Sequence, residues 1–187
     1  MQATKKRLCV LLCAALLLLP VACQKEPWQD LRLFCENYSA LTDDKSALVP
    51  EHFSLEQAAD GSQRWQAAPD ALHLLTLEAL PGGRLHTVSL TTHAEEGMGA
   101  FLAEAKRLLG AFTQAPPDQC ARWLYALGAG EDEPLGFVQL EEGGFRFAYA
   151  ANAAGRYLRI SNLTFLPPES EPPTLRDWII PSNTGDA

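Results

Sequence analysis

The sequence predicts an α+β fold in which an antiparallel sheet of about five strands has helices packed on one face. Three segments carry apolar residues at three- and four-residue steps, which is the periodicity of an amphipathic helix. Other segments alternate apolar and polar residues and are separated by short glycine turns, which is typical of antiparallel strands. Because the helical segments are not interleaved one by one with the strands, the order favours a hairpin plus a three-strand meander.

The first helix is predicted over residues 28–41. The residues 54–57, with the sequence Ser-Leu-Glu-Gln, fit a capping box, so we expect a short helical turn there that Asp60-Gly61 closes. Residues 63–67 are expected to form a weak strand. The apolar stripe of the first helix consists of Trp28, Leu31, Phe34, Cys35, Tyr38 and Leu41.

A β-hairpin is predicted from residues 72–80 and 85–92, which flank Gly82-Gly83. Paired glycines suit a two-residue turn that needs positive φ at both positions. With the glycines at the tip, Leu77 lies opposite Val88, and one face of the hairpin is apolar, which specifies the register. Leu75 then lies opposite Leu90. The other face is expected to meet solvent and carries Thr76, Glu78, Thr87, Ser89 and Thr91.

The second half of the chain is predicted to hold two helices and the meander. Thr92-x-x-Glu95 fits a capping box, and Pro116-Pro117 ends the helix that follows it. A shorter helix is expected at residues 118–127. Strands follow at 135–141, 145–151 and 156–163, with one apolar face made by Val138, Leu140, Phe147, Tyr149, Leu158 and Ile160.

The N-terminal residues 1–22 read as an export signal, with Lys5, Lys6 and Arg7 before an apolar stretch. The sequence Pro20-Val21-Ala22-Cys23 follows, and with this stretch it resembles the signal and lipobox of bacterial lipoproteins. The resemblance implies that Cys23 is lipidated and becomes the mature N-terminus. Residues 23–27 then form a short tether, residues 28–166 a single α+β domain, and residues 167–187 a Pro-rich tail.

The resemblance also implies a location in the cell envelope, with the protein anchored by its lipid. Gln24, next to the lipidated position, favours the periplasmic face of the outer membrane if the host is Gram-negative. Two alternatives stay open, a transmembrane anchor and ordinary secretion after cleavage near Ala22. A membrane span needs about 20 apolar residues, whereas residues 8–22 supply only 15.

The number of cysteines bears on these alternatives. Cys9 and Cys13 leave with the signal, so the exported chain keeps Cys23, Cys35 and Cys120. An odd number is unfavourable in an oxidising compartment. If lipid consumes the Cys23 sulfur, Cys35 and Cys120 remain as a predicted disulfide; two buried free thiols are the alternative.

The net charge of the mature protein limits the classes of partner that it can bind. Three of the 15 basic residues lie in the signal, which leaves 12 against 23 acidic residues and a formal charge of −11. Nucleic acid is therefore not expected as a partner, since phosphate binding needs clustered Lys and Arg. Anionic lipid headgroups would also repel this surface, so membrane attachment rests on the acyl chains.

No pattern of catalytic, cofactor-binding or metal-binding residues stands out in the sequence. The four histidines are not at metal-ligand spacing, and neither His-Glu-x-x-His nor Gly-x-Ser-x-Gly occurs. We expect His73 and His86 to share the hairpin face with Leu75 and Val88, and His93 to lie at a helix start. The sequence therefore predicts a protein that is not an enzyme and has no cofactor.

Two functions from different classes follow. The first is contact with another envelope protein in an assembly, accessory or inhibitory role. The second is binding of a small ligand in a pocket between the helices and the sheet, beside Phe101, Phe147 and Tyr149. In the tail, Trp178, Ile179 and Ile180 are either a latch that folds back on the domain or an anchor for a partner.

Lipidation is tested by metabolic labelling of the chain in a bacterial host with a clickable fatty acid. We expect the parent chain to take up label and Cys23→Ser to take up none, because the thiol that carries the lipid is gone. Equal labelling of the two proteins would contradict the lipoprotein prediction.

Overall fold

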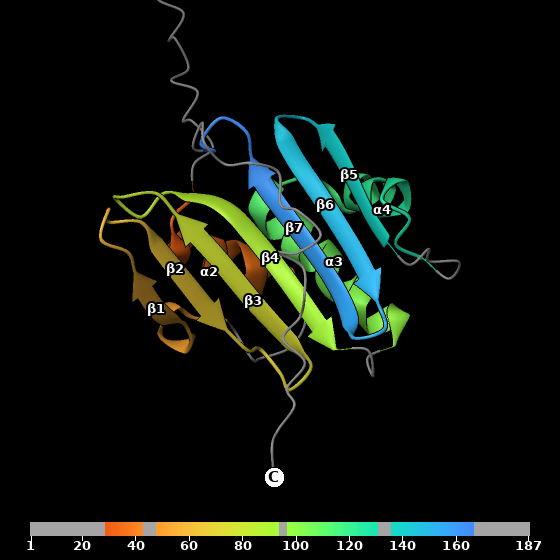
Figure 1. The fold of residues 1–187 in the computed structure, drawn as a ribbon, viewed down its shortest axis with the longest axis horizontal. Helices are drawn as coiled ribbons and strands as arrows, with labels where there is room; N and C mark the ends of the chain where they lie inside the picture. Colours follow the sequence, from red (N-terminus) through yellow and green to blue (C-terminus); the bar gives the residue numbers. More distant parts are fainter. Residues whose placement is uncertain (1–28, 43–47, 94–96, 131–135, 167–187) are drawn as a thin grey trace, which may run out of the picture.

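The sheet is the frame of the molecule. The computed structural model describes residues 29–42, 48–93, 97–130 and 136–166. Within them, seven antiparallel strands form one sheet in the order β1-β2-β3-β4-β7-β6-β5, and the α-helices lie behind it in Figure 1. The predicted α+β class with an antiparallel sheet is confirmed, and the sheet has seven strands rather than about five.

The first half of the chain supplies one helix and four consecutive strands. Asp30 caps the helix, since its side chain accepts a hydrogen bond of 2.8 Å from the Leu33 amide. The elements are α2 (Leu31–Ala40), a 3-10 turn η1 (Pro50–His52), β1 (Ser54–Gln57), β2 (Gln63–Ala67), β3 (His73–Ala79) and β4 (Leu85–His93).

The helical turn predicted at Ser54–Gln57 is wrong, because these residues form the end strand β1 and pair with β2. The Ser54 hydroxyl, expected to cap a helix, donates instead to the Gln66 carbonyl on β2 at 3.2 Å. Asp60 and Gly61 form the turn between the two strands, where Gly61 has φ +84°. Sheet pairing has therefore overridden a local capping pattern.

The second half supplies two helices and three strands. Helix α3 begins after Gly97, so the capping box predicted at Thr92 is wrong: Thr92 lies within β4. Gln114 ends α3 in the left-handed conformation, and Pro117 occupies the first turn of α4 as expected for a residue without an amide proton. The elements are α3 (Met98–Thr113), α4 (Pro117–Ala126), β5 (Gly136–Glu142), β6 (Phe145–Asn152) and β7 (Gly155–Asn162).

The predicted strand registers are confirmed. Leu77 lies opposite Val88 and Leu75 opposite Leu90, as predicted. The predicted two-residue glycine turn is wrong, because the loop has three residues: the Leu80 amide donates to the Arg84 carbonyl at 2.9 Å, and a bulge at His86 restores the register. In the meander, Tyr149 lies between Val138 and Leu158, and Phe147 lies between Leu140 and Ile160. These side chains share the face on which the helices pack, and they form the core with Phe34, Phe101, Leu108, Leu109 and Trp123.

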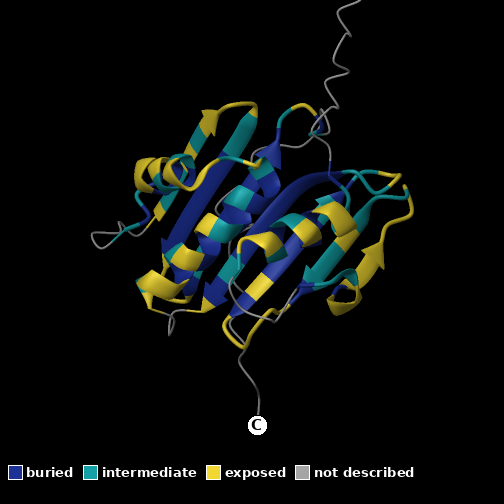
Figure 2. Ribbon diagram, turned by 180° about the vertical axis from the view of Figure 1, so that it is seen from behind, coloured by how far each residue is buried: buried dark blue, intermediate teal, exposed yellow. Residues whose placement is uncertain are grey.

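The two groups of strands meet at β4 and β7. Val88 pairs with Ile160 and Leu90 with Leu158, and all four side chains are fully buried. Helix α3 covers this seam, since it packs on β4, and it also packs on α2 and on α4. Seen from behind, the helices turn exposed residues outward while buried strands lie beneath them (Figure 2).

Gly155 provides a test of the β4–β7 seam. A Cβ atom there would lie 1.9 Å from the Thr92 carbonyl oxygen, and φ is +154°. We expect Gly155→Ala to destabilise the fold by roughly 3 kcal/mol or more in urea unfolding, because backbone would have to move. Gly99, which is exposed in α3 and has no atom near its Cβ position, is the control.

The control Gly99→Ala should stabilise the protein by about 0.5–1 kcal/mol, the helix-propensity difference between the two residues. A Gly155→Ala protein as stable as the parent would contradict the close approach of β7 to β4.

Candidate functional site

The sites predicted at the two ends of the chain lie outside the described residues. This applies to the lipidation site Cys23 and to the proposed contact residues Trp178, Ile179 and Ile180. Among the described residues, no helix has the length and apolar character needed to cross a membrane.

Cys35 and Cys120 are both buried, on α2 and α4, and both are free thiols in the structure. Burial, with the charges of Glu51, Asp30 and Glu36 adding to it, raises the pKa of Cys35 to about 12. Burial also raises the pKa of Cys120. Neither thiol is therefore a reactive nucleophile at neutral pH. Their disulfide stays a prediction, which mass mapping of the unreduced mature chain tests.

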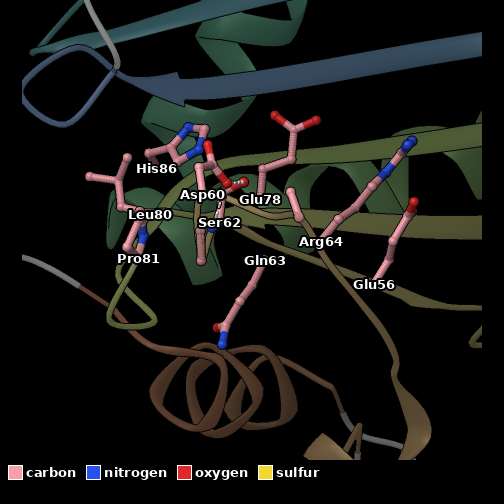
Figure 3. Close-up of a pocket in the computed structure, with 11 residues that line it drawn as sticks. Glu56, Asp60, Ser62, Gln63, Arg64, Glu78, Leu80, Pro81 and His86 are labelled. Atoms are coloured by element: carbon pink, nitrogen blue, oxygen red, sulfur yellow. Dashed lines mark hydrogen bonds between the residues drawn. The ribbon is translucent and has the colours of Figure 1, made fainter.

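A cleft that gathers several charged side chains lies on the side of the sheet away from the helices. It lies between the tips of β1, β2 and the β3–β4 hairpin and has a volume of about 390 Å³. Figure 3 shows Glu78, Arg64 and His86 extending to the same side of the strands, while Gln63 points the opposite way. The charged and titratable groups lining the cleft are Glu56, Asp60, Arg64, Glu78 and His86.

A β-bulge places His86 in this cleft. Glu78 pairs with Thr87 and Ala79 pairs with Leu85, so His86 is the extra residue on β4. The prediction that His86 lies on the apolar face with Val88 was based on unbroken alternation and is wrong for that reason. Bulges re-aim side chains and are frequent beside functional sites.

A chain of hydrogen bonds runs from His86 across the sheet. The Thr87 hydroxyl donates to Ser161 Oγ at 3.0 Å, and it lies 3.0 Å from His86 Nδ1. The Thr87 hydroxyl therefore links the His86 imidazole on β4 to Ser161 on β7. The neighbouring ion pair joins Glu78 to Arg159 at 2.9 Å.

The cleft keeps His86 neutral. Burial lowers the pKa of His86, the negative charge of Glu78 acts against this, and Arg159 acts with it. A base beside two hydroxyl groups is the composition of a nucleophilic site. Thr87 and Ser161 are only 1% and 5% exposed, however, so a substrate has no access to either hydroxyl. The hydrogen-bond chain therefore satisfies buried polar groups, and the open part of the cleft suits a polar contact.

A second buried polar group lies between α2 and α3. Glu104 is buried on the core side of α3 and pairs with Arg107 at 2.5 Å; burial raises the pKa of Glu104 and Arg107 lowers it. The Arg107 guanidinium also lies 5.6 Å from the ring of Tyr38 on α2. Sequence reasoning missed Glu104, although its spacing from Phe101 and Leu108 puts it on the apolar stripe.

The predicted ligand pocket beside Phe101, Phe147 and Tyr149 coincides with packed core. The Phe101 and Tyr149 rings have centroids 5.7 Å apart, and Trp123 lies 4.6 Å from Phe147. All three residues of the predicted pocket are buried. His73, expected at the border of the core, is buried too, with Nδ1 2.7 Å from an Asp70 carboxylate oxygen. The described residues contain no group of three or more His, Cys, Asp or Glu side chains placed to hold a metal ion.

The pH dependence of stability tests the state of His86. Because its folded pKa is lowered, the unfolded chain binds a proton below about pH 6.5 that the folded chain excludes. The stability due to neutral His86 is complete above that pH and is lost as the pH falls toward the folded pKa. We expect His86→Gln to flatten the decline in unfolding free energy between pH 7 and 5. His52→Gln, at an exposed site, is the control and should leave the slope unchanged; equal slopes for parent and His86→Gln would refute the assignment.

Comparisons with protein families, with curated proteins and with solved structures find no match to this chain. A function is therefore inferred from its own residues and their geometry.

Proposed function

We propose that this chain is a lipid-anchored envelope protein that acts, without catalysis, by contact with another protein. The observation that carries the proposal is the end strand β5. It is seven residues long and pairs with β6 on one side, and no described strand lies on its other side. At a strand edge without a described neighbour, a partner can add a further strand.

Charge distribution along β5 supports this role. At its end, Glu141 pairs with Arg146 at 2.7 Å and Glu142 accepts from Gln119 at 3.1 Å. The five residues before them, from Gly136 to Leu140, include no charged side chain. Natural sheets protect an edge against association with charges, prolines or short strands. The other end strand, β1, has four residues and carries Glu56 near its centre.

The position of the domain relative to the predicted lipid supports a partner in the envelope. Leu31, the first residue of α2, lies eight peptide steps after Cys23. Fully extended, they span roughly 25–30 Å. The domain would thus stay near the membrane surface, and its charge of −11 would keep it from lying on anionic lipid. Contacts are then made most readily with proteins anchored in or near the same membrane.

The alternative of small-ligand binding has one specific observation in its favour, the 390 Å³ cleft beside His86 and Glu78, which is in the size range of ligand pockets. Ligand pockets are mostly lined by apolar side chains, whereas seven of the eleven residues that line this cleft are polar or charged. The proposal therefore rests on protein contact, with the cleft as a polar part of the surface.

A photo-cross-linker tests the role of β5 in cells that make the lipidated protein. We expect benzoylphenylalanine at Gln139 to give a specific adduct with another envelope protein, because Gln139 is exposed on the open strand. Gln57 is the matched control, since it has the same side chain and is exposed on the other end strand β1.

An adduct at least about tenfold stronger at position 139 than at position 57 is the expected result for an edge-specific contact. No adduct, or equal adducts at both positions, would contradict the proposal. An adduct only between two copies of the chain would mean self-association instead.

A further inference from the structure

Part of the outer face of the sheet, opposite the helices, is buried without a described element over it. On this face Thr76, Ser89 and Ala148 are 6%, 6% and 2% exposed, as little as the core. No helix or strand of the described ranges lies on this side of the sheet in Figure 1. The expectation that Thr76, Thr87 and Ser89 meet solvent is therefore wrong, although they lie on the predicted face.

The long side chains of the outer face are also sheltered. Arg146 and Arg159 expose 22% and 23% of their side chains, whereas Arg32 and Arg122 on the helices expose 81% and 68%. Ion pairs alone do not explain this difference, since Arg32 pairs with Glu36 and stays exposed. Tyr157, on the same face, is sheltered as well. Burial raises the pKa of its hydroxyl group, although a hydrogen bond with Ser89 lowers it.

The shape of the outer face suits an extended chain segment with large apolar side chains. Ala150 lies directly between Phe137 on β5 and Tyr157 on β7. The two alanines Ala148 and Ala150 form a small apolar cluster with these aromatic residues. Two aromatic walls with alanine between them form a trough one strand wide, which is called the alanine trough below.

We propose that the alanine trough is the docking site of the chain's own C-terminal segment, residues 167–187, through Trp178, Ile179 and Ile180. These are the three large adjacent apolar residues that follow the described domain, in a stretch otherwise rich in Pro, Glu and Ser. Their side chains fill the space over Ala150, and Phe137 and Tyr157 flank them.

The length and starting point of the segment permit this docking. The described chain ends just after β7, beside the β3–β4 hairpin, where the Arg84 guanidinium lies 4.8 Å from the Phe165 ring. Twelve residues from Leu166 to Trp178 span about 40 Å when extended. The trough lies level with Tyr157, only about 13 Å back along β7 from Ser161. Prolines 167, 168, 172 and 173 favour an extended course.

Tethering favours this occupant over a second molecule. A segment joined to β7 by a short linker meets the trough at an effective concentration of roughly millimolar. A second copy or another protein that binds the trough with equal affinity would have to reach this millimolar concentration to compete with the tethered segment. Docking of the segment is a property of the single chain, so it is independent of the contact proposed at β5.

Trypsin cleavage of the purified, full mature chain tests the proposal. Arg176 is the sole Lys or Arg after Arg159, so cleavage there reports on the segment directly. We expect cleavage at Arg176 to be at least about tenfold slower in the protein than in a synthetic peptide of residues 167–187, because a docked segment must open first. Trp178→Ala, introduced in both protein and peptide, should remove this protection.

Two variants of the face locate the docking site. Ala150→Gln fills the trough, and Phe137→Ser removes one wall at the sheet edge. Each variant should abolish the protection of Arg176 against trypsin. Phe137→Ser is used alone if circular dichroism shows that Ala150→Gln does not fold. Tyr125→Ala, at a residue 86% exposed on α4, is the control and should retain protection.

Three outcomes would overturn the proposal. The first is cleavage of the parent protein as fast as the peptide. The second is protection that persists in folded Ala150→Gln or Phe137→Ser. The third is protection that disappears on dilution, which would make a second copy the occupant. No partner protein is present in the experiment, so failure here leaves the β5 contact unaffected.

Discussion

The pairing of β4 with β7 is the constraint on which the rest of the structure depends. It joins a four-strand and a three-strand meander into one sheet, and it brings together residues such as Val88 and Ile160 that are 72 positions apart. Closing so long a loop costs conformational entropy. Burial of Val88, Leu90, Leu158 and Ile160 under the helices offsets that cost.

The close approach of β7 to β4 at this seam also restricts which residues fit beside it. Gly155 starts β7 beside Thr92 and His93, where a side chain would collide with the β4 backbone. Helix α3 follows β4 directly and packs on α2 and α4, so each helix depends on the sheet beneath it. Without the seam, each meander would expose one long edge and half of an apolar face.

The parts of the fold that the sequence predicts are those with local causes. Alternation specifies the pairs Leu77 with Val88 and Tyr149 with Leu158, because a slip of one residue would expose every apolar side chain. The sequence of Ser54–Gln57 predicts a helix start wrongly, because the residue types of a capping box also occur in a strand. No local sequence pattern indicates that β4 pairs with β7. The bulge at His86 adds one residue to β4, so alternation assigns His86 to the wrong face of the sheet.

The candidate site was less predictable than the fold. The polar cleft depends on the bulge and on Arg159 reaching Glu78 from 81 positions away, neither of which periodicity reveals. Threonine and serine on the outer face predict an ordinary solvated surface, and their burial depends on what surrounds them in the folded chain. The aromatic residues expected to line a ligand pocket fill it themselves, because Trp123 and Phe101 occupy the space above the sheet.

The odd number of strands has a consequence for association between copies. In a fully antiparallel sheet of seven strands, the two end strands β1 and β5 run in the same direction. If the helices of two copies stay on one side, β5 of one copy can meet β1 of the next only as a parallel pair. Antiparallel joining is then restricted to β1 with β1 or β5 with β5, across a two-fold axis. Such a joint uses up the edge that formed it, so antiparallel association through β5 alone stops at a closed pair, and a longer assembly would need β1–β1 joints as well.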